Sequence, residues 1–278
     1  MVASLRHAAV GVLAWRVGTA PRACAVTPLV CGDKPVVTST FALMGKMRQI
    51  HADPRVALLA GGTLVQADAR IHVDRNGDAF RGDLLDQESA KFPPTRQLAA
   101  LPGHDRWLRW YFRRIIATLD PVAPAEEVGP DGIVLVALRG GRPWIAALPG
   151  HEHLLGAQPG NQVHLPEFVS GRELDGPAVL LAHRENTAMT ALAQLRLSGD
   201  LKSGRLLVRG RSGSLELRPP RLLAQLGDLR RLGRLASANK AEIDRLAYAA
   251  RHPQRPAPKH RESGLTAHKT DPPPAKES

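Results

Sequence analysis

Three consecutive hydroxyl residues lie between an expected strand and an expected helix. A lysine follows inside that helix. Thr38, Ser39 and Thr40 precede the helix expected over residues 41–52, and Lys46 lies in its second turn. The first turn of a helix has backbone N–H groups without intrahelical partners and the positive end of the helix dipole. Hydroxyl groups and an ammonium at that point are suited to bind a phosphate. The alternative interpretation is ordinary helix capping by Ser39 or Thr40, with a solvated lysine.

The residues around this lysine resemble a known sequence pattern. Residues 46–59 read KMRQIHADPRVALL, which resembles the K-x-x-x-I/L-x-x-x-PRV-x-L-L pattern of pyridoxamine 5'-phosphate oxidase-like flavoproteins. Upstream, GTAPR at 18–22 and VTP at 26–28 resemble the first hairpin of that family. Downstream, FPP at 92–94 resembles the end of a helix that follows the barrel strands. The matches come in family order and cover roughly half of the chain.

The resemblance implies a split antiparallel β-barrel that forms a homodimer and holds FMN or coenzyme F420 in the groove between subunits. Its implied cofactor-binding residues are Arg22 and Thr27 on the second strand, Thr38, Ser39 and Thr40 at the end of the third, and Lys46. The cofactor itself would supply hydride transfer, so the lack of a catalytic side-chain motif argues neither for nor against an enzyme. No catalytic residue and no metal site is predicted.

This chain departs from the family pattern at two places. Many members carry Ser-Arg-Lys at the helix start, whereas residues 44–46 here read Met-Gly-Lys. The arginine that would add a bidentate phosphate contact is therefore missing, and Arg48 is the nearest candidate to replace it. The C-terminal RL-x-x-R motif of true pyridoxamine phosphate oxidases is also absent, so we do not expect that specific activity.

The elements that would position these residues are mainly strands. Short strands are expected over residues 7–17, 22–30, 35–38, 55–60 and 64–73, with a hairpin over 133–147 and helices over 83–91 and 105–119. Hairpin turns and a single short helix between the third and fourth strands favour a mainly β (α+β) fold, a split barrel with flanking helices. We expect this domain to span residues 1–148.

The second half of the chain is expected to form a smaller α+β domain. Residues 149–177 are rich in Gly and Pro and are expected to be a linker. Over 178–250 we expect strands at 178–182, 205–209 and 214–218 and helices at 186–195, 220–235 and 238–250. Strand, helix and strand in this order echo the first half, which indicates either a degenerate half-barrel or chance. Residues 251–278 are expected to be a disordered, basic, Pro-rich tail.

The charge of the chain favours an anionic partner. The formal net charge is +12, and residues 196–245 hold 12 Lys and Arg against 5 Asp and Glu, a net +7. Such a balance suits a phosphorylated cofactor or nucleic acid. Two cysteines without a CxxC pair fit a cytoplasmic protein, and no apolar run is long enough to span a membrane.

Three hypotheses therefore stand. The first is a flavin- or F420-dependent oxidoreductase of unknown substrate. The second is a split barrel that binds or senses a flavin, coenzyme F420 or haem without turnover. The third, which we do not favour, is nucleic-acid association through the basic C-terminal third. An aromatic run, Trp107 and residues 110–112, is interleaved with Arg109, Arg113 and Arg114. We interpret it as packing on the barrel or at the dimer interface and not as a stacking surface.

Overall fold

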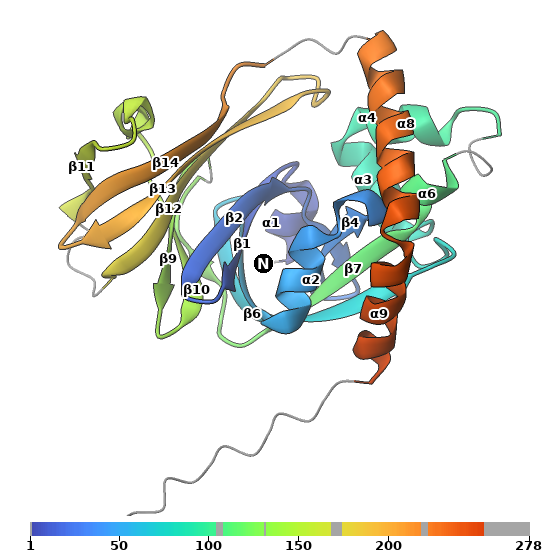
Figure 1. Ribbon diagram of the computed structural model, residues 1–278, viewed down its shortest axis with the longest axis horizontal. Coiled ribbons are helices and arrows are strands. Elements are labelled where there is room, and N and C mark those ends of the chain that lie inside the picture. Colours follow the sequence, from blue (N-terminus) through green and yellow to red (C-terminus); the bar gives the residue numbers. More distant parts are fainter. Residues whose placement is uncertain (1, 104–107, 131, 168–173, 218–221, 253–278) are drawn as a thin grey trace, which may run out of the picture.

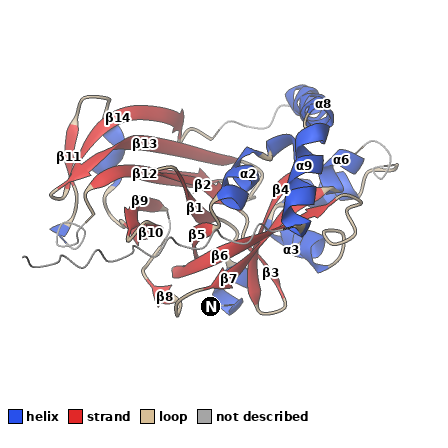
Figure 2. Ribbon diagram, turned by 60° about the horizontal axis from the view of Figure 1, so that its bottom comes forward, coloured by secondary structure: helices blue, strands red, loops and turns tan. Residues whose placement is uncertain are grey.

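The computed structural model describes residues 2–103, 108–130, 132–167, 174–217 and 222–252. Antiparallel sheet dominates, and two sheets lie side by side with helices around the first (Figures 1 and 2). Nearly all of the expected C-terminal tail falls outside the described residues. No described helix has the length and apolar character needed to span a membrane.

The first sheet forms the barrel. Its strands are β1 Gly11–Val17, β2 Ala20–Val26, β3 Leu29–Cys31, β4 Lys34–Thr40, β5 Arg55–Ala60, β6 Thr63–Asp74, β7 Arg114–Pro121 and β8 Glu126–Glu127. Their order is β2-β1-β5-β6-β7-β4-β3, with β8 beside β6. Strands β2 and β3 lie at opposite ends of this order, yet only Thr27 and Pro28 join them. The sheet must therefore curl until its two edges meet, which makes the expected split barrel.

The helix between β4 and β5 fills part of the barrel. It consists of a 3-10 turn η1 Phe41–Leu43 and a helix α2 Gly45–Ala52. Met47 and Ile50 are fully buried, as their spacing predicts, but Leu43 is 59% exposed. The prediction of one continuous helical stripe was wrong at Leu43, because the tighter 3-10 turn rotates its side chain away from the stripe.

Short helices cover the outside of β3, β4 and β7. They are α3 Asp83–Lys91, α4 Pro93–Ala99 and α6 Arg109–Phe112, and α1 Val2–His7 precedes the barrel. The helix expected over 105–119 was wrong, because α6 is the only helix among the described residues of that range, 108–119, and the chain continues as β7. Ile115, Ala117 and Leu119 are completely buried between neighbouring strands. A strand buried on both faces shows no alternation, so periodicity alone cannot distinguish it from a helix.

The second sheet is larger than expected. Its strands are β9 Ile133–Arg139, β10 Arg142–Ala147, β11 Gln162–His164, β12 Gly176–Glu185, β13 Leu192–Lys202 and β14 Arg205–Ser214, in the order β10-β9-β12-β13-β14-β11. The hairpin β9–β10, which we had assigned to the barrel, pairs with β12. Between β10 and β11 lies a 3-10 turn, η2 Glu152–Gly156.

The helix expected over 186–195 was also wrong. The Asn186 side chain accepts hydrogen bonds from the N–H groups of Thr190 and Ala191, at 2.8 and 3.0 Å, and this closes a turn. The following strand buries Leu195 and Leu197 at a period of two. The second half therefore does not repeat the strand–helix–strand order of the first half, because the expected helix is absent from the described residues 186–195.

The two sheets share one layer of core residues. Val12, Ala14, Ala57 and Leu59 from the barrel pack against Val134, Val136, Ile145 and Leu181 from the second sheet. All eight of these side chains are completely buried. The second sheet therefore covers the outer face of β1, β2 and β5 (Figure 2).

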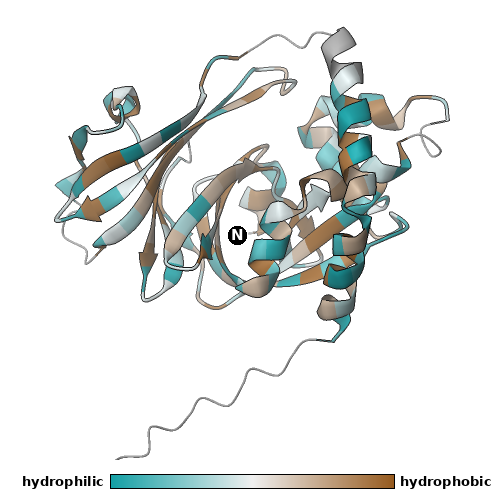
Figure 3. Ribbon diagram, viewed as in Figure 1, coloured by the Kyte–Doolittle hydropathy of each residue, from teal (hydrophilic) through white to brown (hydrophobic). Residues whose placement is uncertain are grey.

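The described side chains of the last two helices pack on the barrel. These helices are α8 Leu222–Ala238 and α9 Lys240–Arg251, close to their expected bounds. Ala236, Ile243 and Leu246 join the barrel core, and Asn239 Nδ2 donates a hydrogen bond of 2.9 Å to the Phe41 carbonyl. Both helices carry hydrophilic and hydrophobic residues, as expected for helices with one buried face (Figure 3).

Candidate functional site

The three hydroxyl residues at the end of β4 do not converge on one point. Thr38 Oγ1 donates to Glu88 Oε2 at 3.4 Å, while Ser39 Oγ donates to the Leu43 carbonyl at 2.8 Å. Thr40 Oγ1 is buried without a hydrogen-bond partner among the described residues. Because successive strand residues point to opposite faces, Ser39 is turned away from Thr38 and Thr40. The three hydroxyl groups therefore do not form one phosphate-binding site together.

A buried polar cluster lies beside Thr38. Arg114 Nη2 donates to Glu88 Oε1 at 2.8 Å, and the hydroxyls of Thr95 and Tyr111 donate to the same oxygen at 3.1 and 3.2 Å. The Arg114 guanidinium also lies 4.2 Å from the centre of the Phe80 ring. Burial and the neighbouring Glu88 carboxylate raise the pKa of Tyr111. The side chains of the protein itself therefore fill the space on this side of β4.

Arg22 and Lys46 lie on a common side of the barrel sheet. Trp15 is paired with Arg22 across β1 and β2, and its Nε1 donates to Gln49 Oε1 at 2.8 Å. Gln49 is three residues after Lys46, so both project from neighbouring positions on α2. Arg22 is exposed, Lys46 is half-buried, and Thr27 is half-buried at the β2–β3 corner. None of these three residues lines a cavity described here.

The Asp-Pro-Arg run at the start of β5 has a structural role. Arg55 binds the Asp53 carboxylate through two hydrogen bonds of 2.8 Å, and Arg16 of β1 binds the same carboxylate. Arg16 Nη1 also donates to the Gly141 carbonyl at 3.2 Å, which connects the barrel to the β9–β10 turn. Arg55 therefore holds the segment between α2 and β5 in place.

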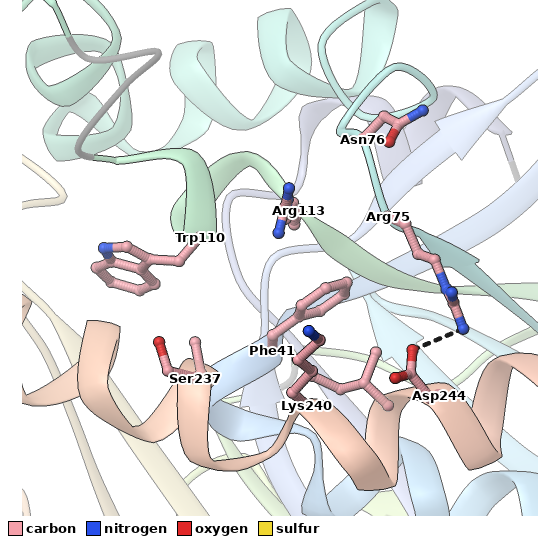
Figure 4. Close-up of a pocket in the computed structure, with 10 residues that line it drawn as sticks. Phe41, Arg75, Asn76, Trp110, Arg113, Ser237, Lys240 and Asp244 are labelled. Carbon is pink, nitrogen blue, oxygen red and sulfur yellow. Dashed lines mark ion pairs between the residues drawn. The ribbon is translucent and has the colours of Figure 1, made fainter.

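A cavity of about 380 Å³ lies between the barrel and the C-terminal helices, and we call it the helix-capped cavity. Its volume falls within the range of small-molecule sites. Residues of the barrel side are Phe41, Arg75, Asn76, Trp110 and Arg113, and those of the helix side are Ala236, Ser237, Lys240, Ile243 and Asp244. Figure 4 shows Ser237 and Lys240 on the helices, facing Trp110, Arg113 and Phe41.

The charge in this cavity is predominantly positive. Arg75 Nη2 forms an ion pair of 2.8 Å with Asp244 Oδ1, drawn as a dashed line in Figure 4. Arg113 and Lys240 form no ion pair with a described residue, and Arg113 Nε is buried without a hydrogen-bond partner in the described part of the chain. A buried donor without an acceptor costs about 1–3 kcal/mol. An anionic ligand would supply that acceptor.

The aromatic surface of the cavity comes from Trp110. Its ring packs edge-on against Tyr111, with ring centres 5.9 Å apart. The aromatic run therefore divides, because Tyr111, Phe112 and Arg114 pack inside the protein while Trp110 and Arg113 line the cavity. We had interpreted the whole run as packing. The arginines interleaved with the aromatic residues were the sequence signal for the alternative, a surface that stacks on a ligand. No sequence signal pointed to Lys240, which lies on a helix far along the chain.

No protein-family model and no curated protein sequence matches this chain. Among solved structures, it is similar to a Listeria innocua protein described as a pyridoxamine 5'-phosphate oxidase, at 18% identity over 44% of this chain and 90% of that one, with a TM-score of 0.32. It is also similar to General Stress Protein 26 from Bacillus anthracis, at 15% identity over 43% and 84%, with a TM-score of 0.29. A FAD-binding protein from Mesorhizobium loti aligns at 16% identity over 44% and 88%, with a TM-score of 0.26. The proposals below rest on residues of this chain.

Proposed function

We propose that this protein binds a phosphate-bearing cofactor of the flavin type, FMN or coenzyme F420, in the helix-capped cavity, and acts with it as an oxidoreductase. The observation that carries the proposal is the buried Arg113 Nε without an acceptor, beside Trp110 and Lys240. A planar ring and an anionic group are the two features that such a cavity selects. The expected substrate is a small molecule.

Each of the three residues has a separate task in this proposal. Trp110 would stack on the ring of the cofactor, since an aromatic face favours a planar partner. Arg113 would hold the phosphate with its planar fork, and Lys240 would add a point charge. The bound cofactor would supply the hydride-transfer chemistry. The protein would bind it, orient it and exclude water through the helices above it.

A second location for the phosphate follows from the family resemblance. It would use Arg22, Thr27, Thr38, Ser39, Thr40 and Lys46, near the start of α2. A cavity of about 410 Å³ does lie there, lined by Gly45, Arg48 and Arg245 among others. However, Arg48 and Arg245 both pair with Glu242, at 3.3 and 3.2 Å. Their charge is partly neutralised, so we favour the helix-capped cavity.

Titration of the purified protein with FMN and with coenzyme F420 tests both locations. We expect Arg113→Gln and Lys240→Ala each to weaken binding of the preferred cofactor by about tenfold or more, the usual loss of a charged hydrogen bond. Arg109→Gln is the matched control, because Arg109 is exposed on α6 and does not line the cavity.

Lys46→Ala decides between the locations. If Lys46→Ala abolishes binding and Lys240→Ala does not, the phosphate lies at the start of α2 and the cavity assignment is wrong. If neither cofactor binds the wild-type chain, the proposed function itself is wrong.

The oxidoreductase and the non-catalytic binder differ in turnover. Reduction of the bound cofactor by NAD(P)H, or oxidation of bound reduced coenzyme F420 by a substrate, supports the enzyme. Binding of a flavin, coenzyme F420 or haem with no such reaction supports a carrier or sensor. The homodimer is a further part of the proposal, and sedimentation velocity of the full chain tests it.

A further inference from the structure

A second and larger cavity adjoins the first. It has a volume of about 880 Å³ and lies between α6 and α8, and we call it the α6–α8 cavity. Trp110 and Ser237 line both cavities, so the indole ring stands at the boundary between them. The cofactor proposal makes no use of this second space.

The walls of the α6–α8 cavity combine apolar surface with positive charge. Leu108, which is 3% exposed, and Leu229 line the cavity together with Trp110. Arg230 and Arg234 lie one turn apart on α8, so both guanidinium groups are on the same face. None of the seven described lining residues is acidic.

A glycine in the middle of α8 keeps the indole against the helix. A Cβ atom placed on Gly233 would lie 3.2 Å from Trp110 Nε1 and 3.4 Å from Trp110 Cδ1. Glycine inside a helix costs about 1 kcal/mol relative to alanine. At Gly233 that cost permits a close approach that places the ring at the boundary of the two cavities.

We propose that the α6–α8 cavity binds an amphiphilic organic anion, in the form of a carboxylate on a medium-length apolar chain. The apolar chain would lie against Leu108, Leu229 and Trp110, where its burial is favourable. The carboxylate would be held by Arg230 and Arg234, whose planar forks match its geometry. The mainly apolar walls favour this ligand over nucleic acid, which offers a row of phosphates and little aliphatic surface.

Calorimetric titration of the cofactor-free full chain with decanoate, 1-decanol and acetate, each below its solubility and micelle limits, tests the site. We expect one decanoate to bind per chain, with quenching of tryptophan fluorescence. Acetate lacks the apolar chain and 1-decanol lacks the charge, so both should bind about tenfold more weakly or worse. Equal binding of decanoate and 1-decanol would contradict the role of the arginines.

Two variants of α8 sharpen the test. The double variant Arg230→Gln/Arg234→Gln should lower decanoate affinity about tenfold and leave 1-decanol unchanged. Arg231→Gln is the matched control, because Arg231 is exposed on the same helix but does not line the cavity. A similar loss in the control, or no loss in the double variant, would overturn the proposal. Because no cofactor is present, this outcome is independent of FMN or F420 binding.

Discussion

Asp53 connects three parts of the molecule through one carboxylate. It binds Arg55 of β5 and Arg16 of β1, and Arg16 extends the contact to the β9–β10 turn. Burial alone would raise the pKa of Asp53, but hydrogen bonds from Arg55 and Arg16 outweigh it and lower the pKa to about 2. The side chain is 19% exposed, so solvent screens this interaction only in part.

This lowered pKa predicts a pH-dependent contribution to stability. The unfolded chain takes up the proton first as the pH falls below the ordinary value of 3.8, so the stabilisation present above that value is lost between about pH 4 and 2. We expect Asp53→Asn to be less stable than the wild type by about 2 kcal/mol at pH 6, with the difference vanishing near pH 2. Urea unfolding at several pH values measures it.

Asp33→Asn serves as the control for this experiment. Asp33 is exposed in the turn between β3 and β4, so its substitution should leave the pH profile unchanged. A constant gap between Asp53→Asn and the wild type from pH 6 to 2 would show that the carboxylate is not held in its charged form.

At the scale of elements, Lys91 of α3 fastens the place where the barrel closes. Its Nζ donates to the Leu5 carbonyl of α1 at 2.7 Å and to the Pro28 carbonyl at the β2–β3 corner. The residue is 8% exposed, and burial together with the charge of Arg6 lowers its pKa to about 8. A helix, the N-terminal segment and the edge of the sheet therefore meet at one ammonium group.

The lowered pKa of Lys91 predicts a change of stability at alkaline pH, whereas that of Asp53 predicts one at acidic pH. Between about pH 8 and 10.5 the unfolded chain binds this proton more strongly than the folded chain. The free energy of unfolding should therefore rise with pH in this window in the wild type, relative to Lys91→Met. Paired urea unfolding at pH 7.5 and 9.5 checks the sign. The exposed Lys202→Met is the control, and an identical pH response in Lys91→Met and the wild type would refute the expectation.

The position of the C-terminal helices α8 and α9 determines the shape of the helix-capped cavity. Helix α9 contributes Ile243 and Leu246 to the barrel core, and Asn239 between α8 and α9 binds the carbonyl of Phe41. These contacts hold Lys240 opposite Arg113 (Figure 4). The cavity therefore exists only because α8 and α9 return to the barrel.

At the scale of the whole molecule, the two sheets form a single packed body. Leu181 of the second sheet is completely buried in the layer shared with the barrel. We expect Leu181→Ala to lower the free energy of unfolding by about 2–5 kcal/mol, because it leaves a cavity between the sheets. One cooperative transition should remain, monitored by both circular dichroism and tryptophan fluorescence.

Leu43→Ala is the matched control, since Leu43 is 59% exposed and its loss should change stability by about 0.5 kcal/mol or less. Two separate transitions in the wild type, with only one shifted by Leu181→Ala, would mean that the sheets unfold independently.

The sequence by itself determined the local features of this protein. Gly and Pro positions marked the hairpins and the end of α2 before Pro54, and the spacing of Met47 and Ile50 marked its buried face. The mainly antiparallel split barrel followed from these signals together with the family resemblance. Such features depend on neighbours within a few residues, which a single chain reveals directly.

Only the tertiary structure decided which distant segments meet. It pairs β9 with β12, makes residues 114–121 a central strand, and turns Thr38 and Ser39 to opposite faces of β4. It also brings Lys240 to Trp110 and Arg113, more than a hundred residues earlier in the chain. These contacts depend on how buried surfaces fit together across the fold, and no local pattern of residue types encodes that fit.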